Sequence, residues 1–300
     1  MIKKILKRLL GKQRSQLAVI HIDGSQRRVV YETDRWIEAP NWSPDGKWLV
    51  FNGDGKLFRI AAEPIHAVNN VAPELIDTGD VHNITNDHVI SPDGGSIYFT
   101  ANGVVYKVPW QGGEPRRVSA ESSTHFYVHG VSPDGKLLSC VGYTTDAPAS
   151  PLASPLAIYL MSLVDGAITK ITNTTVPVDG AEFSRDGQWI YFNGELHAKS
   201  KGHSQIYRMR VDGTDILQLT FDDRVNWFPH VGPDDAAIVY LSYAPNTQGH
   251  PANVDVLLRR LSLSGGKPED VVAIRGGQGS INTNSWAPDG KRFAYVALKS

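Results

Sequence analysis

A short motif close to Ser-Pro-Asp-Gly occurs six times along the 300-residue chain. The copies are WSPDG at 42–46, ISPDG at 90–94, VSPDG at 131–135, FSRDG at 183–187, VGPDD at 231–235 and WAPDG at 286–290. Their prolines, or the arginine that replaces one of them, are 48, 41, 52, 48 and 55 residues apart. This recurrence predicts a closed array of similar units within one domain.

Each copy separates two short runs with strand character, as in NW-SPDG-KWLVF at 41–51 and EF-SRDG-QWIYF at 182–192. Proline presets the backbone at the second position of a type I turn, and Asp suits the third position. Glycine accepts the positive φ from which the next strand begins. The repeated aspartates are therefore predicted to form turns between two strands and not to carry out chemistry.

A second hairpin follows the first in most units, as in VVYKVPWQGGEPRRVS at 104–119 and QIYRMRVDGTDILQLT at 205–220. Two hairpins give four strands per unit, and four strands at a period near 50 residues are typical of a β-propeller blade. LAVIHIDGSQRRVVYE at 17–32 has the pattern of third and fourth strands, and NSWAPDGKRFAYV at 284–296 has that of first and second strands. Pairing them completes a sixth blade and leaves no open sheet edge.

The sequence therefore predicts an all-β chain that forms a six-bladed β-propeller over residues 17–300, with four-stranded blades. The N-terminal strands complete the last blade and close the ring. The motif PNWSPDG at 40–46 and the run IYRM at 206–209 resemble the repeats of TolB-like six-bladed propellers, and the resemblance covers about residues 17–297. Related blades also occur in prolyl-peptidase propellers and oligogalacturonate lyases, so the resemblance is more specific for architecture than for function.

Composition limits the remaining classes of function. The 41% hydrophobic content is enough for a large core. Cys140 is the only cysteine, which excludes an intrachain disulfide and a zinc site built on thiolates, and its apolar strand predicts that it is buried. Without the six basic residues among the first 14, the chain has 24 basic and 31 acidic residues, a formal charge of −7. We therefore expect no nucleic-acid partner.

Residues 1–16 are predicted to form a separate basic amphipathic segment. Its apolar residues follow the spacing of one helical face, with the basic residues off that face: Ile2, Ile5, Leu6, Leu9 and Leu10. Such a helix rests on an anionic membrane surface, packs on a partner or covers part of the protein's own propeller. The segment lacks the long apolar run and the cleavage site of a secretory signal, so we expect a cytoplasmic location. The resemblance to TolB proteins, which are periplasmic, gives the alternative.

The first strand of each blade is expected to line the central channel. The fourth and sixth residues before the proline of each repeat fall on one face at the start of that strand. Nine of these twelve positions hold side chains that form hydrogen bonds, and we predict them as a ligand-binding ring: Glu38, Asn86, His88, Tyr127, His129, Asp179, Trp227, Asn282 and Asn284. The positions between them include Ala39, Val89, Val128, Gly130, Gly180 and Phe228, so polar groups are expected on one side of the strand. The alternative is that the nine groups only solvate a water-filled channel.

The residues favour a binding scaffold over an enzyme. No nucleophile motif such as G-x-S-x-G occurs, and no cofactor is expected. His88, His129, Glu38 and Asp179 would supply nitrogen and oxygen ligands if a divalent metal bound in the channel. We predict that the partner is a protein, a peptide or a small polar ligand such as a sugar. The alternative is a carbohydrate-active enzyme, a lyase or hydrolase, that works at the channel mouth.

Overall fold

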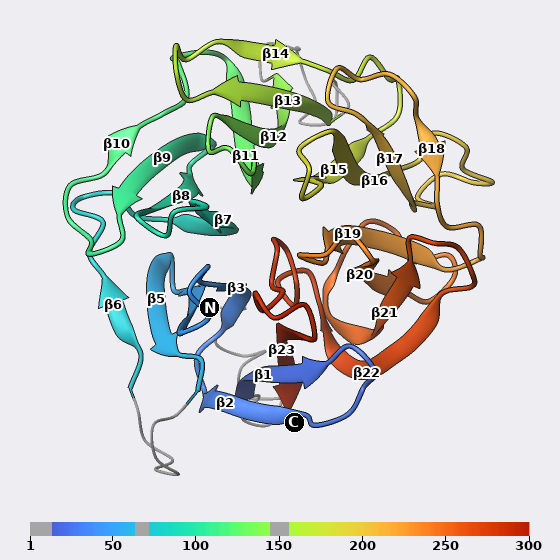
Figure 1. Ribbon diagram of the computed structural model, residues 1–300, viewed down its shortest axis with the longest axis horizontal. Coiled ribbons are helices and arrows are strands. Elements are labelled where there is room, and N and C mark those ends of the chain that lie inside the picture. Colours follow the sequence, from blue (N-terminus) through green and yellow to red (C-terminus); the bar gives the residue numbers. More distant parts are fainter. Residues whose placement is uncertain (1–13, 64–71, 145–155, 300) are drawn as a thin grey trace, which may run out of the picture.

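The computed structural model describes residues 14–63, 72–144 and 156–299 as six antiparallel sheets arranged radially around one axis (Figure 1). The predicted six-bladed β-propeller is confirmed. No helix in these described ranges is long and apolar enough to cross a membrane. The predicted N-terminal segment lies mainly at residues 1–13, outside the described residues, and the first strand already begins at Arg14.

Blades 1 to 3 each contain four strands, which follow one another from the axis outward. Blade 1 consists of β3 (Ile37–Trp42), β4 (Trp48–Gly53), β5 (Lys56–Ala61) and β6 (Glu74–Ile76). Blade 2 consists of β7 (Ile84–Ile90), β8 (Ser96–Ala101), β9 (Val104–Pro109) and β10 (Arg116–Arg117). Blade 3 consists of β11 (Thr124–Val131), β12 (Leu137–Thr144), β13 (Ala157–Ser162) and β14 (Ile168–Lys170).

Blades 4 and 5 repeat the same order. Blade 4 consists of β15 (Val178–Phe183), β16 (Trp189–Gly194), β17 (Gln205–Arg210) and β18 (Leu217–Gln218). Blade 5 consists of β19 (Val225–Val231), β20 (Ala237–Tyr243), β21 (Ala252–Ser262) and β22 (Glu269–Gly277). The outermost strands of blades 1 to 4 are short, whereas β22 extends over nine residues.

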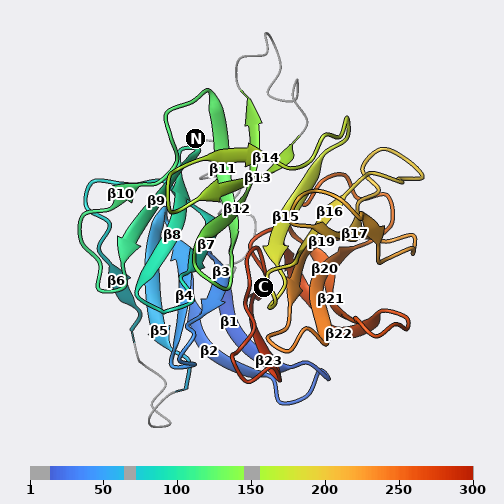
Figure 2. The same ribbon diagram turned by 45° about the horizontal axis from the view of Figure 1, so that its top comes forward.

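Blade 6 joins the two ends of the chain. Its sheet has the order β2 (Arg28–Thr33), β1 (Arg14–His21) and β23 (Arg292–Lys299). β1 pairs with β23 along its whole length, from Arg14 opposite Lys299 to His21 opposite Arg292. β1 lies beside both β2 and β23 in two different views (Figures 1 and 2). The predicted closure by the N-terminal strands is therefore confirmed.

The Ser-Pro-Asp-Gly turns have a shared hydrogen-bond pattern that explains the repeat. In blade 1, the Ser43 hydroxyl donates to Asp45 Oδ1 at 2.6 Å and accepts from the main-chain N–H of Trp48 at 2.9 Å. Asp45 Oδ1 also accepts from the N–H of Lys47 at 3.0 Å, and Gly46 has a φ of 75°. The same Ser-to-Asp bond recurs in blades 2, 3 and 4. The repeated aspartates thus act in the turns, as predicted.

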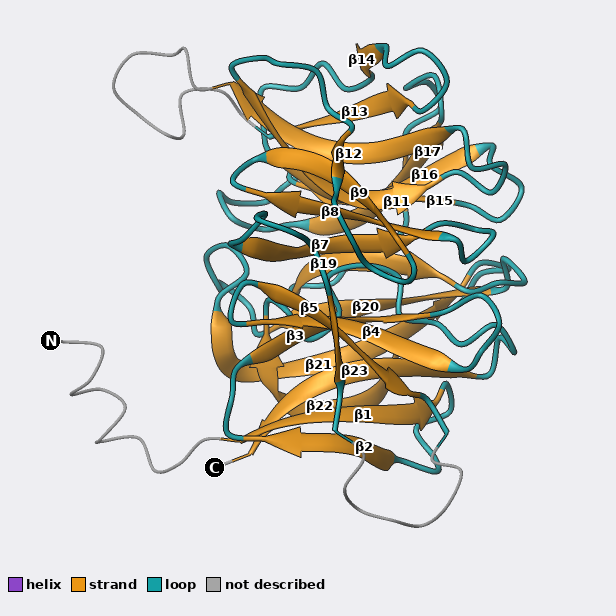
Figure 3. Ribbon diagram, turned by 90° about the vertical axis from the view of Figure 1, so that its left-hand side faces the viewer, coloured by secondary structure: helices purple, strands orange, loops and turns teal. Residues whose placement is uncertain are grey.

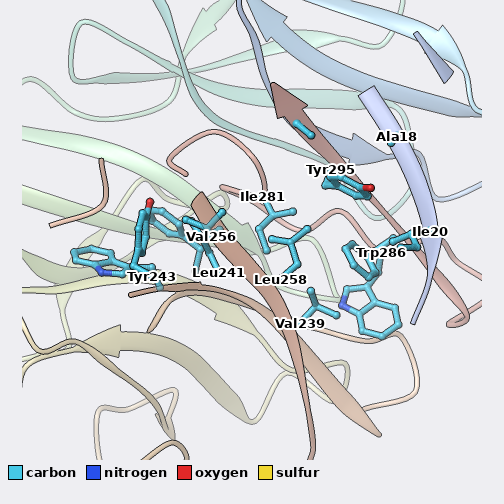
Figure 4. Packing of buried hydrophobic residues seen from close by; sticks show 14 of the residues in the cluster. Ala18, Ile20, Val239, Leu241, Tyr243, Val256, Leu258, Ile281, Trp286 and Tyr295 are labelled. Carbon is cyan, nitrogen blue, oxygen red and sulfur yellow. The ribbon is translucent and has the colours of Figure 1, made fainter. Parts of the chain in front are cut away.

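The hydrophobic core lies between neighbouring blades. From the side, the strands of successive blades form layers, with β1, β2 and β23 together at one side (Figure 3). Between blades 5 and 6, Ile20 and Tyr295 belong to one buried cluster with Val239 and Leu258 (Figure 4). Alternate residues of β1, such as Leu17, pack on the other side against blade 1. Burial of each large side chain contributes roughly 1.5–3 kcal/mol, so this N-terminal strand stabilises two inter-blade interfaces.

Candidate functional site

The inner strands of blades 1 to 5 are interrupted shortly before the turn. In each of these strands the register with the second strand shifts, between Glu38 and Asn41 in β3 and between Asp179 and Glu182 in β15, for example. At three of these bulges the backbone has a positive φ, 53° at Ala39, 66° at Gly180 and 52° at Phe228. A bulge inserts an extra residue and re-aims the side chains that follow it. Polar residues from both nominal faces of the strand therefore reach the axis.

The sixth blade contributes a buried segment to the axis in place of a full inner strand. We call residues 279–285 the axial segment. Within it Ser280, Ile281, Asn282 and Thr283 are at most 2% exposed. An isolated β-bridge between Trp286 and Phe293, and not a continuous ladder, pairs the chain after this segment with β23. The loop that precedes β23, drawn in red, lies in the middle of the ring (Figure 1).

Side chains of the other blades hold the axial segment by hydrogen bonds. The Asn282 amide donates to the carbonyl oxygen of Asn86 at 3.0 Å and to Asp87 Oδ1 at 2.9 Å. The Asn41 amide donates to Thr283 Oγ1 at 2.6 Å and to the carbonyl oxygen of Asn284 at 3.0 Å. These bonds satisfy buried polar groups that would otherwise each destabilise the fold by about 1–3 kcal/mol.

His129 connects the axial segment to two carboxylates. Its Nδ1 lies 3.3 Å from the carbonyl oxygen of Asn282, and its Nε2 lies 3.2 Å from Asp179 Oδ1 and 3.6 Å from Asp87 Oδ1. All these neighbours are acceptors, so both ring nitrogens must carry protons to bond them. The ring also stacks on Phe228, with centroids 6.0 Å apart. The arrangement is a buried imidazolium between two aspartates.

Burial opposes charge in this cluster, and the mutual contacts decide which charges persist. Burial alone would lower the pKa of His129, but the hydrogen bond and negative charge of Asp179, together with Asp87, raise it. Burial alone would raise the pKa of Asp179, but the hydrogen bond and positive charge of His129 lower it. Burial raises the pKa of Asp87 despite the nearby His129. His129 and Asp179 therefore form the principal ion pair.

A second histidine contacts the neighbouring carbonyl of the same segment. His230 Nε2 lies 3.1 Å from the carbonyl oxygen of Ile281, and His230 Nδ1 lies 2.8 Å from Glu182 Oε2. Glu182 Oε1 accepts from the N–H of Val231 at 2.9 Å and from the Asn284 amide at 2.5 Å. Because Ile281 and Asn282 are consecutive, two histidines from different blades fix adjacent carbonyls of the axial segment.

His88 is held differently, as a neutral ring. Since the Asn41 amide nitrogen donates to the axial segment, its Oδ1 accepts from His88 Nδ1, which lies 2.6 Å away. His88 Nε2 is buried and has no hydrogen-bond partner among the described residues. Burial lowers the pKa of His88 to about 3. His88 thus stays uncharged while His129, at the equivalent position of the next blade, is charged.

A large cavity lies at the ends of the inner strands, next to the Ser-Pro-Asp-Gly turns. This turn-face cavity has a volume of about 870 Å³ and is lined by all six blades. Its rim contains the residues at one equivalent turn position: Pro44, Pro92, Pro133, Arg185, Pro233 and Pro288. Trp42, Ile90, Phe183 and Trp286 contribute apolar walls. Asn41, His129, Glu182 and Asn284 also line it, so the residues around the axial segment form its floor.

A second cavity lies at the other end of β3 and β7, where these strands begin. This entry-face cavity has a volume of about 420 Å³. It is lined by Trp36, Glu38, Asn52, Gly53, Asp54, Gly55, Ile84, Thr85, Asn86 and Gln278. The axial segment therefore lies between two hollows at opposite ends of the inner strands.

The structure divides the nine predicted ring residues among several environments. Asn86, His129, Asp179 and Asn282 meet in one network at the axis. Glu38 and Asn86 line the entry-face cavity, whereas His129 and Asn284 line the turn-face cavity. The remaining three contact side chains outside the predicted ring: His88 contacts Asn41, Tyr127 contacts Tyr143, and Trp227 contacts His250. Their role in ligand binding stays a prediction.

Four residues of the axis were missed: Asn41, Asp87, Glu182 and His230. They occupy the third or fifth position before the turn, where the sequence predicted mainly small and apolar groups. That expectation was wrong because the bulges interrupt the alternation of the strand. One signal was available, since Asn41, Glu182 and His230 share the same position in three repeats.

Among the described residues no group of three His, Cys, Asp or Glu side chains is arranged to hold a metal ion.

Comparison with known proteins agrees with this architecture. No protein-family model matches the sequence. The uncharacterised protein Atu1656 of Agrobacterium fabrum strain C58 is 36% identical over 292 residues, 95% of this chain and 93% of that protein. The solved structure of a putative TolB from Agrobacterium tumefaciens is also 36% identical, with a TM-score of 0.86 over 97% of this chain and 100% of that chain.

TolB from Acinetobacter baumannii is more distant, at 19% identity and a TM-score of 0.64, with 91% of this chain and 68% of that chain covered. At this identity the likeness shows the common fold alone. The two relatives at 36% identity cover 95% and 97% of this chain. The chain therefore belongs to the TolB-like six-bladed β-propellers.

Proposed function

We propose that the protein is an interaction scaffold that takes a segment of a protein partner into the turn-face cavity. The observation that supports this proposal is the cavity of about 870 Å³ to which all six blades contribute. A ring closed by paired strands gives this cavity rigid walls, so little ordering is needed when a partner binds.

The chemistry of the cavity favours an extended peptide with apolar side chains. The walls combine two tryptophans with branched and aromatic residues, and a few polar groups converge on the floor. Mostly apolar concave sites with a few fixed polar groups are typical of binding pockets. Glu182 is already bonded to His230 and to Asn284, whereas the side chain of Arg185 is exposed at the rim. We infer that a carboxylate of the partner lies near Arg185.

Selection of peptides from a random display library tests the proposal. The wild type serves as bait, and enriched peptides are measured by calorimetry against Pro92→Trp, which places a large ring on the cavity rim. Pro109→Trp is the matched control, because Pro109 is an exposed proline of the same blade that does not line the cavity. We expect at least tenfold weaker binding to Pro92→Trp and unchanged binding to Pro109→Trp. Equal binding to all three proteins would exclude the turn-face cavity.

The carbohydrate-active alternative is supported by the resemblance of the repeat, and no contact between described residues adds to it. A thermal-shift screen of oligosaccharides with the same three proteins separates the two functions. Stabilisation of the wild type and of Pro109→Trp, but not of Pro92→Trp, would favour a sugar ligand in the turn-face cavity.

A further inference from the structure

The entry-face cavity has a charge pattern that the proposed function leaves unexplained. Two of its lining residues are carboxylates, Glu38 and Asp54, and no Lys, Arg or His is among the described residues that line it. Glu38 and Asp54 also form no ion pair in the described part of the chain. The cavity is therefore an acidic hollow at the end of the ring opposite the turn-face cavity.

Glu38 is fixed against the backbone of the axial segment. Its strand neighbour, Ala39, donates its N–H to the carbonyl oxygen of Gly279 at 2.7 Å. A Cβ at Gly279 would overlap atoms of the Glu38 side chain, and Gly279 also has a φ of 88°. Glycine is thus required where Glu38 packs, and this packing holds the carboxylate at the cavity wall.

Two further side chains point to a ligand that donates hydrogen bonds. Asn52 lies opposite Glu38 in the sheet and is 4% exposed, and its Oδ1 has no hydrogen-bond partner among the described residues. Trp36 and Asn52 lie close enough to the Glu38 carboxyl to lower its pKa against the effect of burial. Trp36 also lines the cavity, and the residue is 40% exposed. An orphaned acceptor, two carboxylates and a partly exposed indole ring are complementary to a cation with N–H groups.

We propose that the entry-face cavity binds an ammonium or guanidinium group carried on an alkyl chain. The charged group lies between Glu38 and Asp54 and donates hydrogen bonds to acceptors of the wall, and the alkyl chain lies on the face of Trp36. Thr85 and Asn86, from the start of β7, supply further polar groups on the other side of the cavity. A lysine or arginine side chain of a protein and a free diamine share this chemistry.

The electrostatics of Glu38 agree with such a ligand. Burial raises the pKa of this carboxyl, and the negative charge of Asp87 raises it further. A bound cation would relieve both effects and favour ionised Glu38. Binding is therefore expected to weaken when the solution is acidified through the range in which Glu38 takes up a proton.

Titrations followed by the indole N–H signals of the tryptophans test the proposal. The Trp36 signal is assigned by its loss in Trp36→Phe. The probes are putrescine, acetyl-lysine N-methylamide and its neutral analogue acetyl-norleucine N-methylamide. We expect a saturable shift of the Trp36 signal with a charged probe, at least a fivefold loss of affinity in Glu38→Gln, and no saturable shift with the neutral analogue. Preference for putrescine indicates a free diamine, and preference for the lysine derivative indicates a protein side chain.

Asp80→Asn is the control, because Asp80 is an exposed carboxylate that does not line the cavity. Affinity within twofold of the wild type is expected for it. An equal response to charged and neutral probes, or wild-type affinity in a folded Glu38→Gln variant, would overturn the proposal. Pro92→Trp changes only the rim of the turn-face cavity, so cation binding should persist in it. The two sites can therefore fail independently.

Discussion

The carboxylate of Asp235 accepts a hydrogen bond from the main-chain N–H of Arg185, with an O···N distance of 2.9 Å. These residues belong to the turns of blades 5 and 4. Between most other blades, a turn glycine lies beside the turn proline of the neighbouring blade. One example is Gly46 of blade 1, where an added Cβ would lie 3.9 Å from Pro288 of blade 6. Arg185 supplies an N–H that proline lacks, and Asp235 takes the glycine position with a φ of 51°. The polar pair therefore replaces the apolar contact of the ring.

A double-mutant cycle on this pair should show coupling. Asp235→Gly removes a strained backbone conformation, which should raise the free energy of unfolding by about 1 kcal/mol. It also removes the hydrogen bond to Arg185, which offsets part of this gain. Arg185→Pro in the wild type leaves Asp235 strained and without its donor. We expect the double variant to be more stable than the sum of the single changes by about 0.5–1.5 kcal/mol in urea denaturation. Additivity within about 0.3 kcal/mol would contradict the coupling.

The turns should tolerate loss of the aspartate charge but not of the glycine. Asp45→Asn keeps an oxygen that can accept from Ser43 and Lys47, so its melting temperature should stay within a few degrees of the wild type. Gly46→Val forces a β-branched residue to a φ of 75° and should destabilise the protein by about 1–2 kcal/mol or more. Calorimetry measures both. If Asp45→Asn abolishes peptide binding in a fully folded protein, the turn aspartates act in function after all.

His88 should make the protein less stable in acid. Its folded pKa of about 3 lies below the ordinary value of 6.5, so between these values the unfolded chain binds a proton that the folded chain does not. Stability should then fall by up to about 1.4 kcal/mol per pH unit as the pH is lowered through this window. His88→Asn keeps a donor toward Asn41 and does not titrate. The difference in unfolding free energy between variant and wild type should depend on pH in this sense, and a constant difference would show that His88 is not buried and neutral.

His129 should act in the opposite direction. Asp179 and Asp87 raise the pKa of His129 despite its burial. The stabilisation of the fold by the charged ring is therefore complete below about pH 6.5, and it is lost as the pH rises through the raised pKa of His129. His129→Asn leaves two buried carboxylates without their cation and should cost about 3–5 kcal/mol near pH 6. The loss should shrink as the pH increases in chemical denaturation. A loss that grows with pH would mean that the ring is neutral.

Removal of residues 292–299 should abolish the closed ring. β23 supplies the whole partner edge of β1, and Ala294 and Val296 are buried between blades 6 and 1. Without them the chain exposes the edge of β1 and two apolar faces, which favours aggregation. Size-exclusion chromatography and thermal melting measure the result. A monomer with an unchanged melting temperature would show that the ring does not depend on this pairing.

The sequence determined the number of blades and the mode of closure, because both follow from local information. Proline, Asp and Gly act within a few residues of the turn they form, so each motif identifies a hairpin without knowledge of the rest of the chain. The complementary half-blades at 17–32 and 284–296 follow from the same pattern. The sequence also indicated that polar side chains gather at the starts of the inner strands.

Only the tertiary structure decided which of those side chains meet. After the bulges at Ala39, Gly180 and Phe228, the side chains of each strand point to the opposite face from the one that strict alternation predicts. A prediction based on alternation does not account for the inserted residue. Asp87, His129 and Asp179 come from three consecutive blades, so their contact depends on how these blades pack against one another. The axial segment lies at the centre for a similar reason: its polar groups are buried and need partners, and His129, His230 and Asn41 of other blades supply them. Such partners are distant in sequence, and only packing brings them within hydrogen-bond distance.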